Sequence, residues 1–289
     1  MIRKFEAAVI SALLVLAVCF CGCAGNNDKD AKRVSTVNKI DVTYPLVTEM
    51  ADEKTLDEVC GYMRSAGLAN VDAFCDEVKE FNGFAGAKAN LTSAWVKPDE
   101  IKTDIGACID GWENNCDFSD KNCRMTAFSL LDGLISADKT DNVYDGTYLM
   151  FDVDAIENVD RYGLIKEKEA LFTSMFGERS IAPGEQAQDV FTRIWNEYGF
   201  KLSEDNISLI SVVLLTADHT QVFVGHTGVL IELEDCLLFI EKLAFEQPYR
   251  VTKLNSLNEL IDIFKGRAEY FEGDDLSGTF FYKNDKMIL

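Results

Sequence analysis

The chain has 289 residues, of which 47% are hydrophobic, and this is enough to fold around a sizeable core as one domain or two. Its 49 acidic residues outnumber the 28 basic ones and leave a formal net charge of −21. Such a surface repels nucleic acid and anionic lipid head groups, so DNA and RNA are excluded as ligands.

The N-terminus has the layout of a bacterial secretory signal. A short basic segment precedes an uncharged apolar run from Ala7 to Val18, which is too short for a comfortable membrane span. Gly22 stands before Cys23, as in signals that are cleaved before a cysteine that then carries lipid. We therefore predict a signal peptide at residues 1–22 and a lipid on Cys23, which anchors the protein to the extracytoplasmic face of the cell membrane. An ordinary signal peptide cut nearby is the alternative.

Residues 23–42 are polar and low in aromatics, which is typical of a flexible tether, and residues 43–289 are expected to form a single domain. This domain begins with apolar residues at helical spacing over 53–81, interrupted at "SAGLAN". Cys60 and Cys75 lie on the apolar faces of the two predicted helices. We therefore expect them to meet across a helical hairpin and to form a disulfide.

Six cysteines remain after the predicted cleavage and lipidation, and outside the cytoplasm an even count indicates disulfides. They are Cys60, Cys75, Cys108, Cys116, Cys123 and Cys236. If Cys123 stays free, one other cysteine is left over, and the sequence does not resolve this conflict. No cysteine–histidine spacing typical of structural zinc occurs, and the acidic loops lack EF-hand spacing. We therefore expect neither a metal nor another cofactor.

The stretch "NCRMTAFSLLDGLI" places Cys123 at the start of a predicted amphipathic helix, with Asn122 or Asp120 as its N-cap. "TYLMFDVDAIEN" follows and is interpreted as a strand that turns into a loop. Residues 164–199 are expected to form two helices separated by "SIAPGE", in which Pro183 suits a helix start.

Three segments rich in Val, Ile and Phe, divided by short polar turns, predict an antiparallel meander. They are "NISLISVVLL", "QVFVGHTGVLIEL" and "CLLFIEKLAF". A further helix is predicted from Leu254 to Phe264, and "SGTFFYKND" is expected to add an edge strand. Helices that come first and strands that come later indicate an α+β fold.

The turn "ELED" predicts how two of these strands pair. If it sets Leu233 opposite Cys236, the side chains of His226 and Glu241 share one face of the sheet. Glu241 is then the diagonal neighbour of His226, and Gly228 contributes no side chain between them. A carboxylate in this position can orient the imidazole and stabilise its charged form.

Cys123, His226 and Glu241 together are the parts of a thiol hydrolase. A helix N-terminus and an imidazolium lower the pKa of a thiol, the histidine carries the proton, and the acid holds the tautomer. Backbone N–H groups at the helix start can form part of an oxyanion hole. We therefore predict Cys123 as nucleophile, His226 as base and Glu241 as the orienting acid. The other histidine, His219 in "TADHTQ", is expected to be exposed.

Each of these residues also has a purely structural interpretation. Cys123 can lie in the core or form a disulfide with the nearby Cys116. His226 can simply pack against the sheet. Glu241 and its neighbour Lys242 can be solvated charges on a strand.

Several unusual strings occur in the same order as in a bacterial lipoprotein family. They are "NCRMTAFSLL", "FDVDAIEN", "NISLISVV", "VGHTGVLIE", "LLFIEKLAFEQPYR" and "FFYKND". Over roughly residues 43–289 the chain resembles this family, which is catalogued as a domain of unknown function, number 4300. The resemblance implies a secreted, lipid-anchored protein with one family domain, but no established activity.

A cysteine at a helix start, a histidine entering a strand and a polar residue on the next strand are similar in order to papain-like hydrolases, which include cell-wall peptidases and amidases. The similarity implies a papain-like α+β fold, with N-terminal helices followed by an antiparallel sheet. It also implies a cysteine peptidase or amidase that acts on cell-wall peptide. The chain departs at Arg124, where a small residue is usual, and at Glu241, where His, Asn or Asp is common. A non-catalytic surface lipoprotein that binds a peptide or glycan is the alternative.

Overall fold

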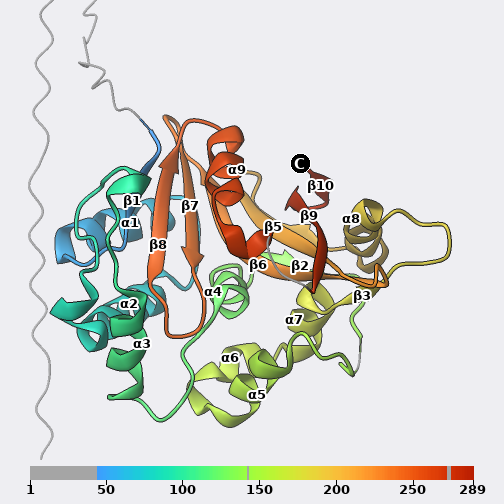
Figure 1. Ribbon diagram of the computed structural model, residues 1–289, viewed down its shortest axis with the longest axis horizontal. Coiled ribbons are helices and arrows are strands. Elements are labelled where there is room, and N and C mark those ends of the chain that lie inside the picture. Colours follow the sequence, from blue (N-terminus) through green and yellow to red (C-terminus); the bar gives the residue numbers. More distant parts are fainter. Residues whose placement is uncertain (1–43, 142, 272–274) are drawn as a thin grey trace, which may run out of the picture. The chain divides into compact units, whose positions relative to one another are not determined.

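Figure 1 shows the computed structural model, which describes residues 44–141, 143–271 and 275–289. The predicted signal peptide at 1–22, the lipid-bearing Cys23 and the tether at 23–42 lie outside these residues. The described part of the chain belongs to one compact unit. None of the helices within it is both long and apolar enough to cross a membrane.

An antiparallel sheet with the strand order β1-β8-β7-β6-β5-β9-β10 runs through this unit, and β3 also pairs with β6. Its strands are β1 (Leu46–Thr48), β3 (Arg179–Ser180), β5 (Ile207–Thr216), β6 (Gln221–Glu232), β7 (Leu237–Lys242), β8 (Tyr249–Leu254), β9 (Leu276–Lys283) and β10 (Lys286–Met287). A smaller sheet pairs β2 (Ile135–Ser136) with β4 (Lys201–Leu202). The structure is therefore of the mixed helix and sheet class that the sequence predicts, with antiparallel pairing.

Helices α1 (Glu53–Ser65) and α2 (Val71–Ala85) form the predicted hairpin. The Asp52 carboxylate accepts a hydrogen bond of 2.9 Å from the Thr55 N–H and so caps the start of α1. A disulfide joins Cys60 to Cys75 across the hairpin, with the two Cα atoms 6.6 Å apart. The other helices are α3 (Ile105–Glu113), α4 (Cys123–Leu130), α5 (Met150–Asn158), α6 (Gly163–Lys166), α7 (Glu169–Phe176), α8 (Ala187–Tyr198) and α9 (Leu257–Lys265), with short 3-10 helices η1 (Ala87–Ala89), η2 (Pro98–Glu100), η3 (Asp160–Tyr162) and η4 (Ala268–Tyr270).

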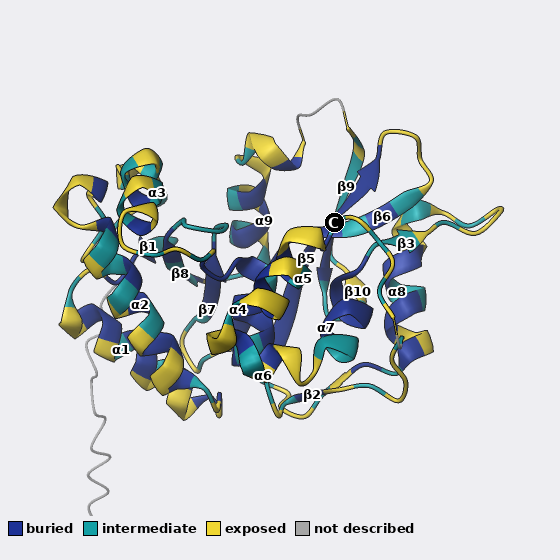
Figure 2. Ribbon diagram, turned by 90° about the horizontal axis from the view of Figure 1, so that it is seen from below, coloured by how far each residue is buried: buried dark blue, intermediate teal, exposed yellow. Residues whose placement is uncertain are grey.

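Helices pack on both faces of the sheet and turn their buried sides towards it (Figure 2). Val229 and Ile240 belong to the larger apolar core, which also takes side chains from α1, α2, α4, α7 and α8. Leu230 and Phe239 belong to a second core under α9. Because alternate residues of a strand point to opposite faces, one strand serves both cores.

The predicted register between β6 and β7 is confirmed. The Leu233 N–H donates to the Cys236 carbonyl across the turn at 2.9 Å, and Val229 lies opposite Ile240. Beyond that pair β6 continues along β5, whereas β7 continues along β8. A Cβ at Gly228 would lie 2.5 Å from the Ile240 carbonyl oxygen, so only glycine fits where the two strands part.

A β-bulge in β6 lies directly before His226. Along β5, Val212 lies opposite His226 but Val213 lies opposite Val224, so Gly225 is the extra residue. The bulge turns Val224 to the face of the larger core, whereas His226 keeps the face of Leu230 by regular alternation. The ring of His226 therefore lies on the α9 side of the sheet, where it packs against an α9 phenylalanine.

Four interpretations of the sequence are wrong. Leu254 is the last residue of β8 and not the start of a helix, since α9 begins only at Leu257. "TYLMFDVDAIEN" contains the whole of helix α5 and no strand, because Asp152, Ala155 and Ile156 are buried at helical spacing. Pro183 lies in the loop before α8, which begins only at Ala187. Strand β9 is not an edge strand, because it pairs with β5 on one side and with β10 on the other.

Candidate active site

Helix α4 holds Cys123 in its first turn. Asn122 is the N-cap, because its Oδ1 accepts from the Met125 N–H and its carbonyl accepts from the Thr126 N–H, each at 3.0 Å. The first N–H groups of a helix have no acceptors within it. Within the described residues, the N–H groups of Cys123 and Arg124 have no protein acceptor. Two free donors therefore lie beside the thiol.

Arg124 fixes the start of α4 to two neighbouring elements. Its guanidinium donates to both carboxylate oxygens of Asp152 in α5, at 2.9 and 2.7 Å, and to the Val224 carbonyl in β6 at 2.9 Å. The Asp152 carboxylate also accepts from the Asn122 amide at 2.7 Å. The arginine that follows the cysteine thus anchors the cysteine-bearing turn against the strand that carries the histidine.

His226 connects the thiol to a carboxylate. Its imidazole lies close enough to the Cys123 thiol for each group to shift the pKa of the other, and its Nε2 lies 2.7 Å from Oε2 of Glu241. The ring of Tyr270 stacks on the imidazole with 5.7 Å between centroids. The structure therefore brings together the three residues that the sequence analysis singled out, with the histidine in the middle.

Arg267, just after α9, is a member of the site that the sequence analysis missed. Its two terminal nitrogens donate to the two carboxylate oxygens of Glu241, at 2.7 and 2.6 Å. It also donates to the Tyr270 hydroxyl at 2.9 Å. Such a two-pronged pair is strong and directional. No spacing in the sequence indicates it, because α9 reaches β7 only through the tertiary fold.

The electrostatics of these groups favour a charged thiol and imidazole. Burial opposes ionisation of Cys123, but the charge and hydrogen bond of His226 outweigh it and lower the pKa of the thiol below its ordinary value. Burial likewise disfavours the imidazolium, yet the thiolate and Glu241 raise the pKa of His226 to about 9. Arg267 and His226 overcome burial and hold the pKa of Glu241 far below its usual range.

A cleft of about 520 Å³ opens at His226. Gln247, Arg267, Glu269 and Tyr270 contribute polar groups to its walls. Cys123 is itself only 5% exposed and does not line the cleft, whereas His226 does. A ligand in this cleft therefore meets His226 first.

Glu241 and Lys242 are not solvated strand charges, because their exposed fractions are 1% and 0%. Lys242 lies in a different environment from its neighbour. Its ammonium is 2.7 Å from Oδ2 of Asp120 and about 4 Å from the ring centroids of Phe81 and Tyr249. Burial lowers the pKa of Lys242, against the opposing pull of the Asp120 carboxylate. Asp120, the alternative helix cap, is used in this ion pair.

The other cysteines of the described residues differ from Cys123. Cys108, Cys116 and Cys236 are free, so the alternative disulfide between Cys116 and Cys123 is not formed. Burial raises the pKa of the Cys108 thiol to about 11 and raises those of Cys116 and Cys236 as well. His219 is exposed in its turn, as expected. No group of three or more potential metal ligands occurs in the part of the chain that the structure describes.

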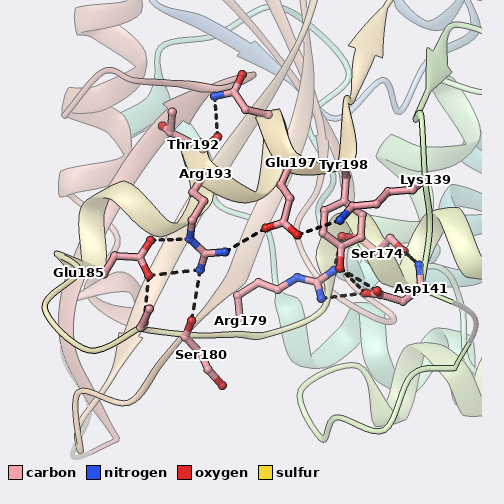
Figure 3. A network of polar contacts seen from close by, with 12 residues as sticks. Lys139, Asp141, Ser174, Arg179, Ser180, Glu185, Thr192, Arg193, Glu197 and Tyr198 are labelled. Atoms are coloured by element: carbon pink, nitrogen blue, oxygen red, sulfur yellow. Dashed lines mark hydrogen bonds and ion pairs between the residues drawn. The ribbon is translucent and has the colours of Figure 1, made fainter.

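A second polar network surrounds α8 and shares no residue with this site (Figure 3). Arg193 binds Glu197 one turn along the helix, and Arg179 pairs with Asp141, which also accepts from the Tyr198 hydroxyl. Several of these side chains are half exposed. The residues drawn in Figure 3 include no thiol and no imidazole, so the network is better explained as a clamp between α8 and the loops beside it.

Comparison with known proteins identifies the family of the chain but indicates no activity for it. The model of the domain of unknown function DUF4300 matches residues 46–288. No curated protein and no solved structure matches the chain. The chain therefore belongs to the DUF4300 family.

Proposed function

We propose that the protein is a cysteine hydrolase that cuts an amide bond in a peptide. The observation that carries this proposal is the chain of contacts from Cys123 through His226 to Glu241, closed by Arg267. A thiol at a helix start, an imidazole and an orienting acid are what nucleophilic amide cleavage requires. Their order along helix, strand and next strand supports the papain-like comparison.

The reaction follows from the positions of these groups. The Cys123 thiolate attacks the amide carbon, and the free N–H groups of Cys123 and Arg124 stabilise the oxyanion. His226 gives its proton to the leaving nitrogen, the C–N bond breaks, and a thioester remains on the sulfur. Water then attacks the thioester while His226 takes a proton, which releases a carboxylic acid and restores the thiolate. Glu241 keeps the imidazole in one orientation throughout.

Glu241 can serve as the third group because of its partner. A carboxylate buried without compensation is costly, but here two hydrogen bonds from Arg267 balance its charge. The acid therefore stays ionised and accepts from the imidazole. This accounts for a glutamate at a position where papain-like enzymes commonly have another residue.

Alkylation of Cys123 tests the proposal. With iodoacetamide at about pH 5, Cys123 should react faster than Cys108, Cys116 or Cys236, because its thiol alone has a lowered pKa while burial raises the pKa of the other three. His226→Ala should abolish this advantage, and the matched change His219→Ala at the exposed histidine should not. Circular dichroism of each variant checks that it folds. Slow labelling of Cys123, or labelling indifferent to His226, would overturn the proposal.

A non-catalytic protein that binds a peptide or glycan is the second candidate. The small exposure of Cys123 favours it, because a ligand can fill the cleft at His226 without reaching the sulfur. The labelling experiment separates the two candidates, since only a hydrolase needs an ionised thiol.

We further propose that a lipid on Cys23 holds the protein at the extracytoplasmic face of the cell membrane, where cell-wall peptide is the substrate at hand. The support is the apolar run that ends at Gly22 and the polar tether that follows. Cys23→Ala should release the protein from the membrane fraction or block its processing. Normal mature mass and unchanged membrane association in this variant would contradict the lipid.

A further inference from the structure

The cleft at His226 does not end at the catalytic groups. A second cleft of about 370 Å³ shares Arg250 and Arg267 with it. Ile101 and Ile263 line this second cleft above a floor that includes Val47. The two hollows are therefore neighbours across a pair of arginines, next to α9 and β8.

Strand pairing sets the length of this double cleft. Arg250 lies opposite Glu241 across β7 and β8, and Val47 lies opposite Thr252 across β8 and β1. The path from Glu241, which contacts His226, to Val47 in β1 spans two strand spacings, or about 10 Å, and the step from His226 to Glu241 lengthens it further. About four residues of extended peptide cover that distance.

Arg250 at the junction has an unused donor. Its Nη2 is 2.7 Å from Oε1 of Glu49, which compensates its charge. Its Nε is buried and has no hydrogen-bond partner. A buried donor without a partner is costly, and an acceptor such as a peptide carbonyl would satisfy it. The far end, with Ile101 and Ile263, suits an apolar side chain.

We propose that the two clefts form one groove for an extended peptide of about four residues, with an apolar side chain seated between Ile101 and Ile263 and a backbone carbonyl at Arg250. This inference rests on the proposed hydrolase, because the groove leads the peptide to His226 and Cys123. A small amide would fill only the cleft at His226. Both basic and acidic side chains line the groove, among them Arg250, Arg267, Asp262 and Glu269. A long anionic polymer would therefore not bind there more tightly than a neutral peptide.

Reactive peptides of increasing length test the groove. Chloromethyl ketones of one to four residues extend to the acyl side of the reactive carbon, and iodoacetyl peptides of the same lengths extend to the amine side. In both, the Cys123 thiolate forms a C–S bond and halide leaves. Because the groove runs in one direction from His226, one series should alkylate Cys123 about tenfold faster or more at four residues than at one, given a leucine at the far end. The other series should not respond to length.

Ile101→Asp should remove the gain with length and leave the rate with iodoacetamide unchanged. The matched control is Ile181→Asp, which is also half buried but lines neither cleft, and it should keep the gain. A rate independent of length in both series, with fast labelling by iodoacetamide, would overturn the groove and leave the hydrolase standing. A length gain that survives Ile101→Asp would also overturn it. Slow labelling by iodoacetamide itself would instead refute the proposed function.

Discussion

The two faces of β7 hold neighbouring buried charges with different partners. Glu241 on one face meets an imidazole that touches a thiol and lies at the cleft. Lys242 on the other face meets the Asp120 carboxylate and two aromatic rings, and it lines no part of the cleft at His226. Both residues are buried and paired, so burial and pairing do not by themselves identify a functional group. What distinguishes Glu241 is a partner that can exchange a proton and that faces a cleft.

The largest effect should come from the Lys242 face. Lys242→Met leaves Asp120 buried without its cation, and removal of one partner of a buried pair costs about 3–5 kcal/mol of unfolding free energy. Urea unfolding measures it. The control Lys201→Met, at an exposed pair with Asp138, should change stability by less than about 0.5 kcal/mol. If the folded Lys242 variant loses fast labelling of Cys123, the separation of the two faces is wrong.

The disulfide should act on the same face with a smaller effect. It closes a sequence separation of 15 and should stabilise the fold by about 3 kcal/mol. Replacing Cys60 and Cys75 together by serine should lower the unfolding free energy by that amount. The labelling of Cys123 should not change, because α2 packs on the Lys242 face of β7, where its Phe81 ring contacts the Lys242 ammonium. Peptide mapping without reduction should show the link. Two free thiols at these positions would contradict it.

The Glu241 face should respond in both stability and reactivity. Glu241→Gln keeps the shape but removes the charge opposite Arg267, at a cost of about 1.5–3 kcal/mol for the weakened charged hydrogen bonds. It should also slow labelling of Cys123 at about pH 5, though less than His226→Ala, because the ring remains. Glu232→Gln, at the exposed end of β6, is the matched control. If Glu241→Gln lowers stability but leaves the labelling of Cys123 unchanged, Glu241 only stabilises the fold, as Lys242 does, and has no effect on the thiol.

The smallest change is expected in the unaltered protein as pH varies. Folding lowers the pKa of the Cys123 thiol and raises that of the His226 imidazole to about 9, so the two shifts change the number of bound protons in opposite directions and offset each other in the pH dependence of stability. The alkylation rate of Cys123 should therefore climb less steeply than that of an unperturbed thiol between about pH 6.5 and 8.5. That of Cys236, whose pKa burial raises, should climb about tenfold per pH unit. Parallel profiles for the two cysteines would show that Cys123 is not ionised.

The sequence predicts the parts of the fold that depend on local patterns. Asn122 and Asp120 were both candidate caps, and the pairing of Leu233 with Cys236 followed from one short turn. From that register alone His226 and Glu241 fall on one face. The prediction succeeds because side chains alternate with a period of two and a turn fixes the register.

Other features depend on contacts that no local pattern encodes. Strand β1 has three residues and is recognisable only beside β8, which was itself not predicted. The segment "TYLMFDVDAIEN" is interpreted from the sequence as a strand that turns into a loop, but its apolar residues Met150 and Phe151 are exposed, whereas Asp152 is buried. Arg267 reaches Glu241 from 26 residues away along the chain. The residues that support the site were therefore harder to find than the residues that form it.

The position of Arg267 near the end of the chain has a consequence for biosynthesis. A nascent chain makes Cys123, His226 and Glu241 before it makes the arginine that compensates Glu241. Until α9 and the residues after it have been translated, the carboxylate has no clamp, and the imidazole has no fixed acceptor. The charge balance of the whole cluster of Cys123, His226 and Glu241 therefore depends on a residue that is translated well after all three of them.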